Sequence, residues 1–123
     1  MEKRLAVAIE KYDTAALEKI LRDDYFDTYE GDKRAMSKRQ AVALCKKGWL
    51  KYLAIVRDSR MSRQDDLIAV EGEAKLIPNV EGDGVPLEQW VHIRRLWTKM
   101  DGKWLLTAQF RRLEGDDGKG EED

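Results

Sequence analysis

Apolar residues recur at helical spacing in the first part of the chain. Residues 5–12 carry apolar positions on one side with charges between them, which predicts an amphipathic helix. A second helix is predicted over residues 14–22, because the carboxylate of Asp13 can accept hydrogen bonds from the open amides of the next turn. Ser37 and Gln40 have the spacing of a capping box, which predicts a third helix that ends near Gly48.

The pattern then changes towards a period of two. Strands are predicted over residues 50–56, 68–76, 88–100 and 103–113, and a short strand over residues 25–30 precedes the third helix. The segment 57–64 is too polar for its faces to be assigned. The segment 78–86 carries prolines and glycines and is typical of a loop.

Asp101 and Gly102 join the last two predicted strands. This pair favours a type I′ turn, because both central residues tolerate positive φ. The turn predicts these cross-strand pairs: Trp97 with Leu106, Arg95 with Ala108, and Ile93 with Phe110. The face with Ile93, Arg95, Trp97 and Phe110 is the more apolar and is expected to be the core face; the other carries Trp90, His92, Leu96, Leu105, Gln109 and Arg111.

The order of these elements is two helices, a strand, a helix and a run of strands. Such segregation is typical of an α+β domain with an antiparallel sheet. The length of 123 residues suits one domain, which is predicted over residues 1–113. Residues 114–123 are rich in glycine and acidic residues and are expected to form a disordered tail.

Composition narrows the classes of function. The formal net charge is -1, so the average charge gives no case for nucleic acid or an anionic membrane as partner. One cysteine and one histidine exclude an internal disulfide and a multi-histidine metal site, and no cofactor is predicted. The chain has neither an apolar run long enough to span a bilayer nor the apolar stretch of a secretory signal, so a soluble, cytoplasmic protein is predicted.

Three segments resemble a known superfamily. The run from Arg95 to Trp104, the run from Asp13 to Leu17, and Asp24-Tyr25-Phe26 resemble the nuclear transport factor two-like superfamily, closest to its SnoaL-like branches and to the association domain of calcium/calmodulin-dependent kinase. The resemblance implies a cystatin-like cone, in which about three helices lie across a curved sheet and enclose a pocket. It also implies a homodimer through the sheet, and it implies no single activity.

Arg95 is the first candidate for a site residue. The predicted register places its guanidinium on the core face, where a permanent charge needs a partner or water. The resemblance to the kinase association domain implies an arginine that points into the cavity and anchors an anion. The alternatives are an internal ion pair with a carboxylate of the fold and a position at the open rim.

Other large side chains are candidates for the pocket or for an interface. The predicted pocket set is Arg95, Trp97, Ile93, Phe110, Tyr29, Tyr25 and Trp49, and the alternative for its aromatic members is ordinary core packing. Trp90, His92, Leu96 and Leu105 share the outer face and are predicted to form a dimer interface, the alternative being scattered surface residues. The resemblance also draws attention to Glu30 and Asp32, because ketosteroid isomerase, a relative by fold, holds its base near the end of this strand. The stretch Tyr29-Glu30-Gly31-Asp32 gives no clean match, so both are interpreted as solvated turn carboxylates and the isomerase activity is not carried over.

These residues lead to three hypotheses on function. The first is a pocketed domain that binds a small amphipathic molecule with an anionic or carbonyl group. The second is an isomerase or dehydratase that uses an acid–base pair in the same cavity. The third is an assembly module without a ligand.

Overall fold

A computed structural model describes residues 1–30, 34–76 and 89–113. These residues contain three helices, which are α1 (Glu2–Glu10), α2 (Thr14–Ile20) and α3 (Lys38–Lys46). The strands are β1 (Leu21–Tyr29), β2 (Met36–Ser37), β3 (Ile55–Gln64), β4 (Leu67–Leu76), β5 (Gln89–Met100) and β6 (Lys103–Leu113). The loop predicted over residues 78–86 and the tail predicted over 114–123 lie outside the described residues.

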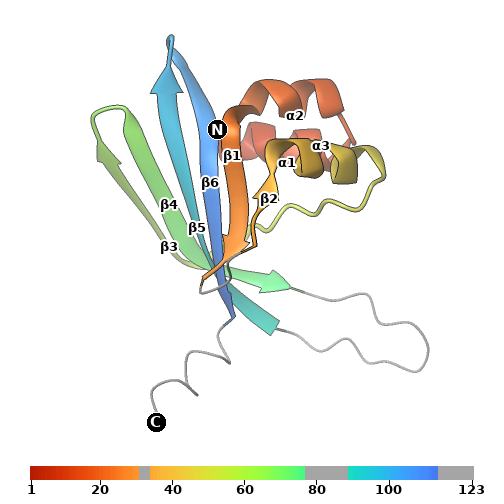
Figure 1. Ribbon diagram of the computed structural model, residues 1–123. Helices are drawn as coiled ribbons and strands as arrows, with labels where there is room; N and C mark the ends of the chain where they lie inside the picture. Colours follow the sequence, from red (N-terminus) through yellow and green to blue (C-terminus); the bar gives the residue numbers. More distant parts are fainter. Residues whose placement is uncertain (31–33, 77–88, 114–123) are drawn as a thin grey trace, which may run out of the picture.

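The strands form one curved, open sheet in the order β2-β1-β6-β5-β4-β3. All neighbouring strands are antiparallel except β1 and β6, which run parallel. The three helices gather on one side, beside β1 and β2, while β3 and β4 extend away from them (Figure 1). The α+β cone expected from the sequence is therefore present, with one parallel strand pair in its sheet.

Local sequence signals set the helix ends. The Asp13 side chain accepts from the amide of Ala16 at 3.0 Å and begins α2. Ser37 and Gln40 form both halves of the predicted capping box at the start of α3. The second helix is shorter than predicted, because Leu21 already has an extended backbone and begins β1.

The edge strand β3 is where the prediction from the sequence pattern is wrong. Residues 47–54 form no regular structure, so the strand predicted over 50–56 is wrong except at its end. The segment 57–64, which the sequence left unassigned, belongs to β3. This strand lies at the edge of the sheet with nearly all its side chains exposed, so it needs no alternation of apolar and polar residues.

The turn between β5 and β6 forms as predicted, with φ of 50° at Asp101 and 77° at Gly102. Trp97 pairs with Leu106 as predicted, but a bulge between the Trp97 and Leu96 pairs shifts all pairs farther from the turn, from Leu96 to Val91, by one residue. The predicted pairs of Arg95 with Ala108 and of Ile93 with Phe110 are therefore wrong; the pairs are Arg95 with Gln109, Arg94 with Phe110, and Ile93 with Arg111. The shift moves Gln109 and Arg111 to the inward face.

The main core lies between the helices and the sheet. Its buried members include Leu5 and Ile9 of α1, Leu17 of α2, and Trp97 and Leu106 of the sheet. A smaller cluster of Leu53, Ala74, Val91 and Ile93 continues the core towards β4. Among the described residues, no helix is long and apolar enough to cross a bilayer.

Candidate functional site

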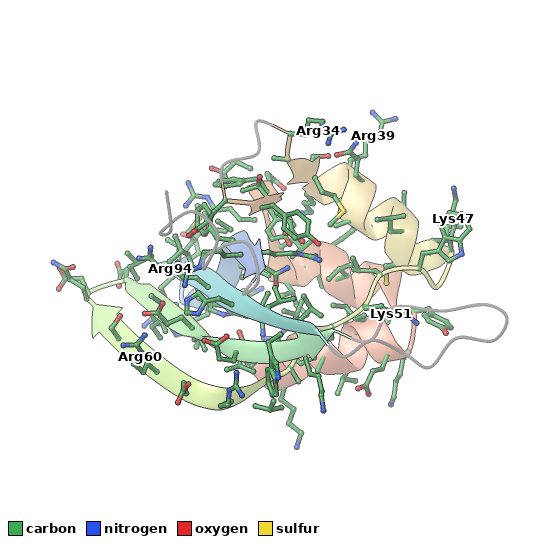
Figure 2. The ribbon with its side chains drawn as sticks, turned by 90° about the horizontal axis from the view of Figure 1, so that it is seen from below. Arg34, Arg39, Lys47, Lys51, Arg60 and Arg94 are labelled. Carbon is green, nitrogen blue, oxygen red and sulfur yellow. The ribbon has the colours of Figure 1, made fainter. Side chains whose placement is uncertain are left out.

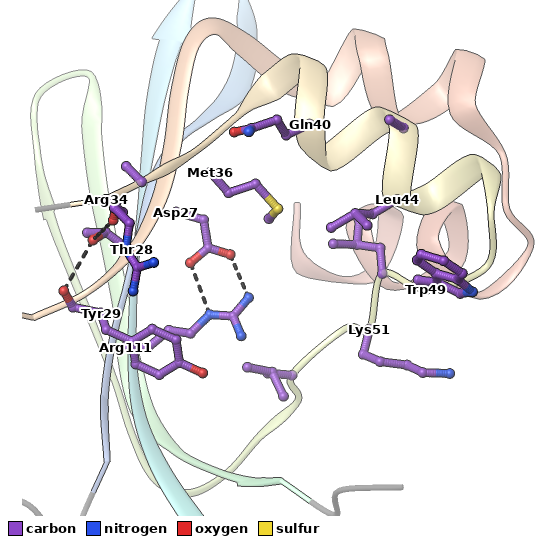
Figure 3. A pocket seen from close by; sticks show the side chains of 14 residues that line it. Asp27, Thr28, Tyr29, Arg34, Met36, Gln40, Leu44, Trp49, Lys51 and Arg111 are labelled. Atoms are coloured by element: carbon purple, nitrogen blue, oxygen red, sulfur yellow. Dashed lines mark hydrogen bonds and ion pairs between the residues drawn. The ribbon is translucent and has the colours of Figure 1, made fainter. Parts of the chain in front are cut away.

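A pocket of about 740 Å³ opens between β1, α3 and the loop that follows α3. Its walls include Met36, Leu44, Trp49, Leu50 and Leu53, which are all apolar. Its charged lining residues are Asp27, Arg34, Lys51 and Arg111. Figure 3 shows that Asp27 and Arg111 face each other on the sheet side, while Trp49 and Lys51 lie at the opposite side of the pocket. The pocket is thus amphipathic.

Asp27 and Arg111 form a two-point ion pair. Nε of Arg111 donates to Oδ1 of Asp27 at 3.0 Å, and Nη2 donates to Oδ2 at 2.6 Å. The Asp27 side chain is 4% exposed and that of Arg111 is 19% exposed. Burial lowers the pKa of Arg111, but hydrogen bonds to Asp27 and its negative charge outweigh burial, so the pKa lies above its ordinary value. Arg111 is therefore a permanent cation at the pocket wall.

Strand pairing explains how these two residues meet. Tyr25, Asp27 and Tyr29 alternate along β1, so their side chains point to one face. The parallel pairing places Asp27 beside Gln109, and Tyr29 beside Arg111. The bulge in β6 turns Arg111 to the same face, where its guanidinium lies 5.7 Å from the Tyr29 ring.

Arg95 lies in the core and does not line this pocket. Its side chain is 0% exposed, and its guanidinium donates to Glu2 at 2.9 Å, to Gln109 at 2.7 Å and to the Leu53 carbonyl at 2.8 Å. Of the alternatives raised by the sequence, the internal ion pair with a carboxylate of the fold is the one found. The guanidinium of Arg95 is therefore used within the fold and does not face this pocket.

The carboxylate of Glu2 is held by three donor side chains, those of Arg95, Tyr52 and Trp97, called here the Glu2 cradle. Besides Arg95, the Tyr52 hydroxyl and the Trp97 indole each donate to its carboxylate at 2.8 Å. Burial raises the pKa of Glu2, but the charge of Arg95 and the three donors outweigh burial, so the pKa is lowered. Burial raises the pKa of Tyr52 to about 12.

One side chain joins the cradle to the pocket. Gln109 accepts from Arg95 through Oε1 and donates to Oδ2 of Asp27 at 2.9 Å through Nε2. Glu2, Arg95, Gln109, Asp27 and Arg111 thus form one hydrogen-bonded set, called here the buried polar network. Through Gln109, the network holds Asp27, and with it Arg111, from the core side of the pocket.

The remaining predicted pocket residues are divided between four places. Tyr29 and Trp49 line the pocket, and Tyr25 lines a smaller cavity behind it. Ile93 and Trp97 are buried in the core. Phe110 lies opposite Arg94 because of the bulge, and its ring packs edge-on against Phe26 with centroids 5.5 Å apart. Phe110 is therefore turned away from the pocket.

The predicted interface residues all lie on the outer face of the sheet. The two ring nitrogens of His92 lie 3.2 Å from Glu71 and 3.4 Å from Glu73. The ring of Trp90 is covered by the guanidinium of Arg57 at 3.7 Å. Leu96 and Leu105 are partly buried. The dimer interface stays a prediction for these four residues.

Sequence reasoning missed Asp27 and Arg111. A signal for Asp27 was present, because a strand over residues 25–30 with Tyr25 and Tyr29 inward also turns Asp27 inward. For Arg111 there was none, since the turn alone put it on the outer face. Glu30, considered as a base, lies 3.8 Å from Arg112, and Asp32 lies outside the described residues.

The chemistry open to the pocket follows from its donors and acceptors. Both oxygens of Asp27 already accept hydrogen bonds from Arg111, and Gln109 adds another. His92, the one histidine of the chain, lies on the outer face of the sheet. Within residues 1–30, 34–76 and 89–113, no group of His, Cys, Asp and Glu could hold a metal ion. In this arrangement donors from Arg111 and Gln109 occupy the oxygens of Asp27.

Known structures share this fold across most of the chain. An NTF2-like (nuclear transport factor two-like) protein from Cytophaga hutchinsonii has a TM-score of 0.71 at 23% identity, with 91% of each chain covered. An NTF2-like protein of unknown function in nutrient uptake from Rhodospirillum rubrum has a TM-score of 0.68 at 23% identity, covering 91% of this chain and 93% of that one. A putative calcium/calmodulin dependent protein kinase II association domain from Xanthomonas campestris reaches 0.63 at 16% identity, covering 90% and 81%.

These similarities confirm the NTF2-like fold that the sequence predicted. No protein-family model and no curated protein matches the chain. At such identities the similarity shows the fold alone, and the function has to be argued from the pocket.

Proposed function

We propose that this NTF2-like domain binds a small amphipathic molecule in the pocket beside Asp27 and Arg111. The observation that carries the proposal is the buried ion pair of Asp27 and Arg111 at the sheet side of an amphipathic pocket of about 740 Å³, opposite apolar walls. An apolar cavity with a few placed polar groups is the usual form of a small-molecule site. The apolar body of the ligand would lie against Met36, Leu44 and Leu50.

Arg111 is the group that would hold the polar end of the ligand. Asp27 engages Nε and Nη2, and Tyr29 also forms a hydrogen bond with this side chain, which carries five N–H donors in all and so has others for a ligand. These suit a carboxylate or a carbonyl oxygen. Among the described residues that line the pocket, three are cations, Arg34, Lys51 and Arg111, and one is a carboxylate, Asp27, which favours an anionic ligand.

The proposal is tested with fatty carboxylates of graded length and the alcohols of equal length. We expect the carboxylates to raise the melting temperature more than the alcohols do. Ala43→Phe places a ring in the pocket from an exposed position on α3 and should abolish the shift. Ala54→Phe is the matched control, because Ala54 is exposed and does not line the pocket. Equal shifts in the two variants, or no shift in the wild type, would refute the proposal.

An acid–base enzyme is supported less well by the same geometry. Asp27 is the carboxylate that a proton abstraction would use, and the donors of Arg111 and Gln109 occupy its oxygens. A ligand-free assembly module would leave the amphipathic pocket without a role. The homodimer and the cytoplasmic location stay predictions from the sequence.

A further inference from the structure

The charge of the chain is distributed unevenly along the sequence. Between Asp32 and Asp58, residues 34–57 contain no aspartate or glutamate and seven basic residues: Arg34, Lys38, Arg39, Lys46, Lys47, Lys51 and Arg57. The chain as a whole has a net charge of -1, so this segment departs strongly from the average. The segment comprises β2, α3, the loop beside the pocket and the start of β3.

Most of these cations lie along one side of the molecule. Figure 2 shows Arg34, Arg39, Lys47 and Lys51 along α3 and the following loop, whereas Arg60 and Arg94 lie at the opposite side, over the sheet. Lys38 pairs with Asp23 at 3.1 Å, and Arg57 covers Trp90. The exposed residues Arg39, Lys46, Lys47 and Lys51 are called here the basic surface.

Two exposed aromatic side chains adjoin the basic surface. Trp49 is 67% exposed, and the ammonium of Lys47 lies 5.0 Å from the centre of its ring. Tyr12 is 58% exposed and lies against Gly48, since a Cβ on this glycine would be 3.3 Å from the Tyr12 ring. Asp13, in the turn after α1, carries a carboxylate close to Tyr12, and this carboxylate accepts a hydrogen bond from the amide of Ala16.

Trp49 and Lys51 also line the pocket, so the basic surface and the pocket share one rim. We propose that this rim docks on an anionic lipid surface, with Trp49 at the level of the head groups and the lysines against the lipid phosphates. Tryptophan is favoured at membrane interfaces because one part of its ring system is apolar and its N–H is polar. Lysine and arginine next to it bind anionic lipid electrostatically.

The exposed aromatics and the apolar wall of the pocket favour lipid over nucleic acid as the partner. Nucleic acid would need the cations to follow a phosphate backbone and gains nothing from an apolar wall beside them. The inference differs from the expectation of no membrane partner, which rested on the net charge. Net charge averages over the whole chain, while a lipid surface meets only one side of it.

Vesicle sedimentation of the full chain tests the proposal. We expect binding to vesicles of phosphatidylcholine mixed with phosphatidylglycerol, no binding to phosphatidylcholine alone, and release as salt is raised. Lys46→Gln/Lys47→Gln should weaken binding by about fivefold for each charge removed. Trp49→Ala should weaken it further and should remove a blue shift of the tryptophan fluorescence.

Arg60→Gln/Arg94→Gln is the matched control, because it removes as many exposed cations from the opposite side. This control should bind like the wild type. Equal weakening of both double variants would show an effect of net charge alone and would overturn the proposal. Tighter binding to a single-stranded oligonucleotide than to the mixed vesicles would overturn it as well.

The docking surface and the proposed ligand pocket are tested separately. Ala43→Phe blocks the pocket and leaves the four cations and Trp49 in place, so it should retain vesicle binding. If the wild type binds free carboxylates but not the mixed vesicles, the docking proposal alone is wrong. If it binds the vesicles but no free carboxylate, the proposed function alone is wrong.

Discussion

Glu2 and Arg95 are 93 residues apart in the sequence, and their side chains form an ion pair of 2.8 Å inside the curved sheet. The guanidinium is 0% exposed, so its charge needs this partner. Glu2 belongs to the first turn of α1, and the pair therefore ties the start of the chain to the middle of β5. The pair also supports Gln109, which holds Asp27 at the pocket wall.

Removing the carboxylate should destabilise the whole fold. We expect Glu2→Gln to lower the free energy of unfolding by about 3 kcal/mol, because it leaves a buried cation without its counter-charge. Urea denaturation measures the loss. Glu10→Gln is the control, since Glu10 is exposed on the same helix and should change stability by less than about 0.5 kcal/mol. Equal losses in the two variants would contradict a structural role for the ion pair.

The same pair predicts how stability depends on pH. The pKa of Glu2 is lowered from 4.5 in the folded protein, because the donors around it outweigh burial. A lowered folded pKa adds stability above the unfolded value, and this contribution is lost as the pH falls through 4.5 and below. The free energy of unfolding of the wild type should therefore fall more steeply in this range than that of Glu2→Gln. Parallel curves would show that Glu2 is not linked to folding.

Gln109 should be needed for the link between the core and the pocket. Gln109→Leu removes both the acceptor for Arg95 and a donor to Asp27, so we expect a loss of about 2 kcal/mol in the free energy of unfolding. Gln64→Leu, at an exposed position of β3, is the control and should be nearly neutral. The carboxylate affinity of the pocket should fall in Gln109→Leu alone. A variant as stable as the control would show that the network does not support the fold.

Gly72 permits the close approach of β3 to β4. A Cβ at this position would collide with Cγ2 of Ile55 and would lie 3.0 Å from the carbonyl oxygen of Arg57. We expect Gly72→Ala to cost about 2 kcal/mol through overpacking, measured by urea denaturation. Shortening Ile55 to alanine in the same chain should recover part of this cost, which would appear as a non-additive double-mutant cycle. Additive losses would indicate that the backbone contact alone is responsible.

Gly102 provides a comparison without a steric clash. Nothing lies within 4 Å of its Cβ position, and its φ of +77° is the only obstacle to a side chain. Gly102→Ala should therefore cost about 1 kcal/mol. The Ile55→Ala change should leave this cost unaltered, and any recovery there would weaken the explanation given for Gly72.

Local signals in the sequence predicted the elements that local physics controls. Asp13 and Ser37 begin helices because their side chains satisfy amides within the next turn. Asp101 and Gly102 make the tight turn because both adopt positive φ. These features depend on neighbours within a few residues, and together they were enough to indicate the α+β fold.

The site depended on contacts that no local pattern contains. A single bulge after Leu96 reversed the faces of Gln109 and Arg111, since side chains alternate at every residue of a strand. The parallel pairing of β1 with β6 then brought Asp27 to Arg111. Likewise, nothing in the sequence distinguishes Glu2 from other acids in the first turn of a helix. Its role follows from its contact with Arg95, which only the fold brings about. Register and long-range pairing are set by the packed sheet, so only the tertiary structure decided where the pocket and its charges lie.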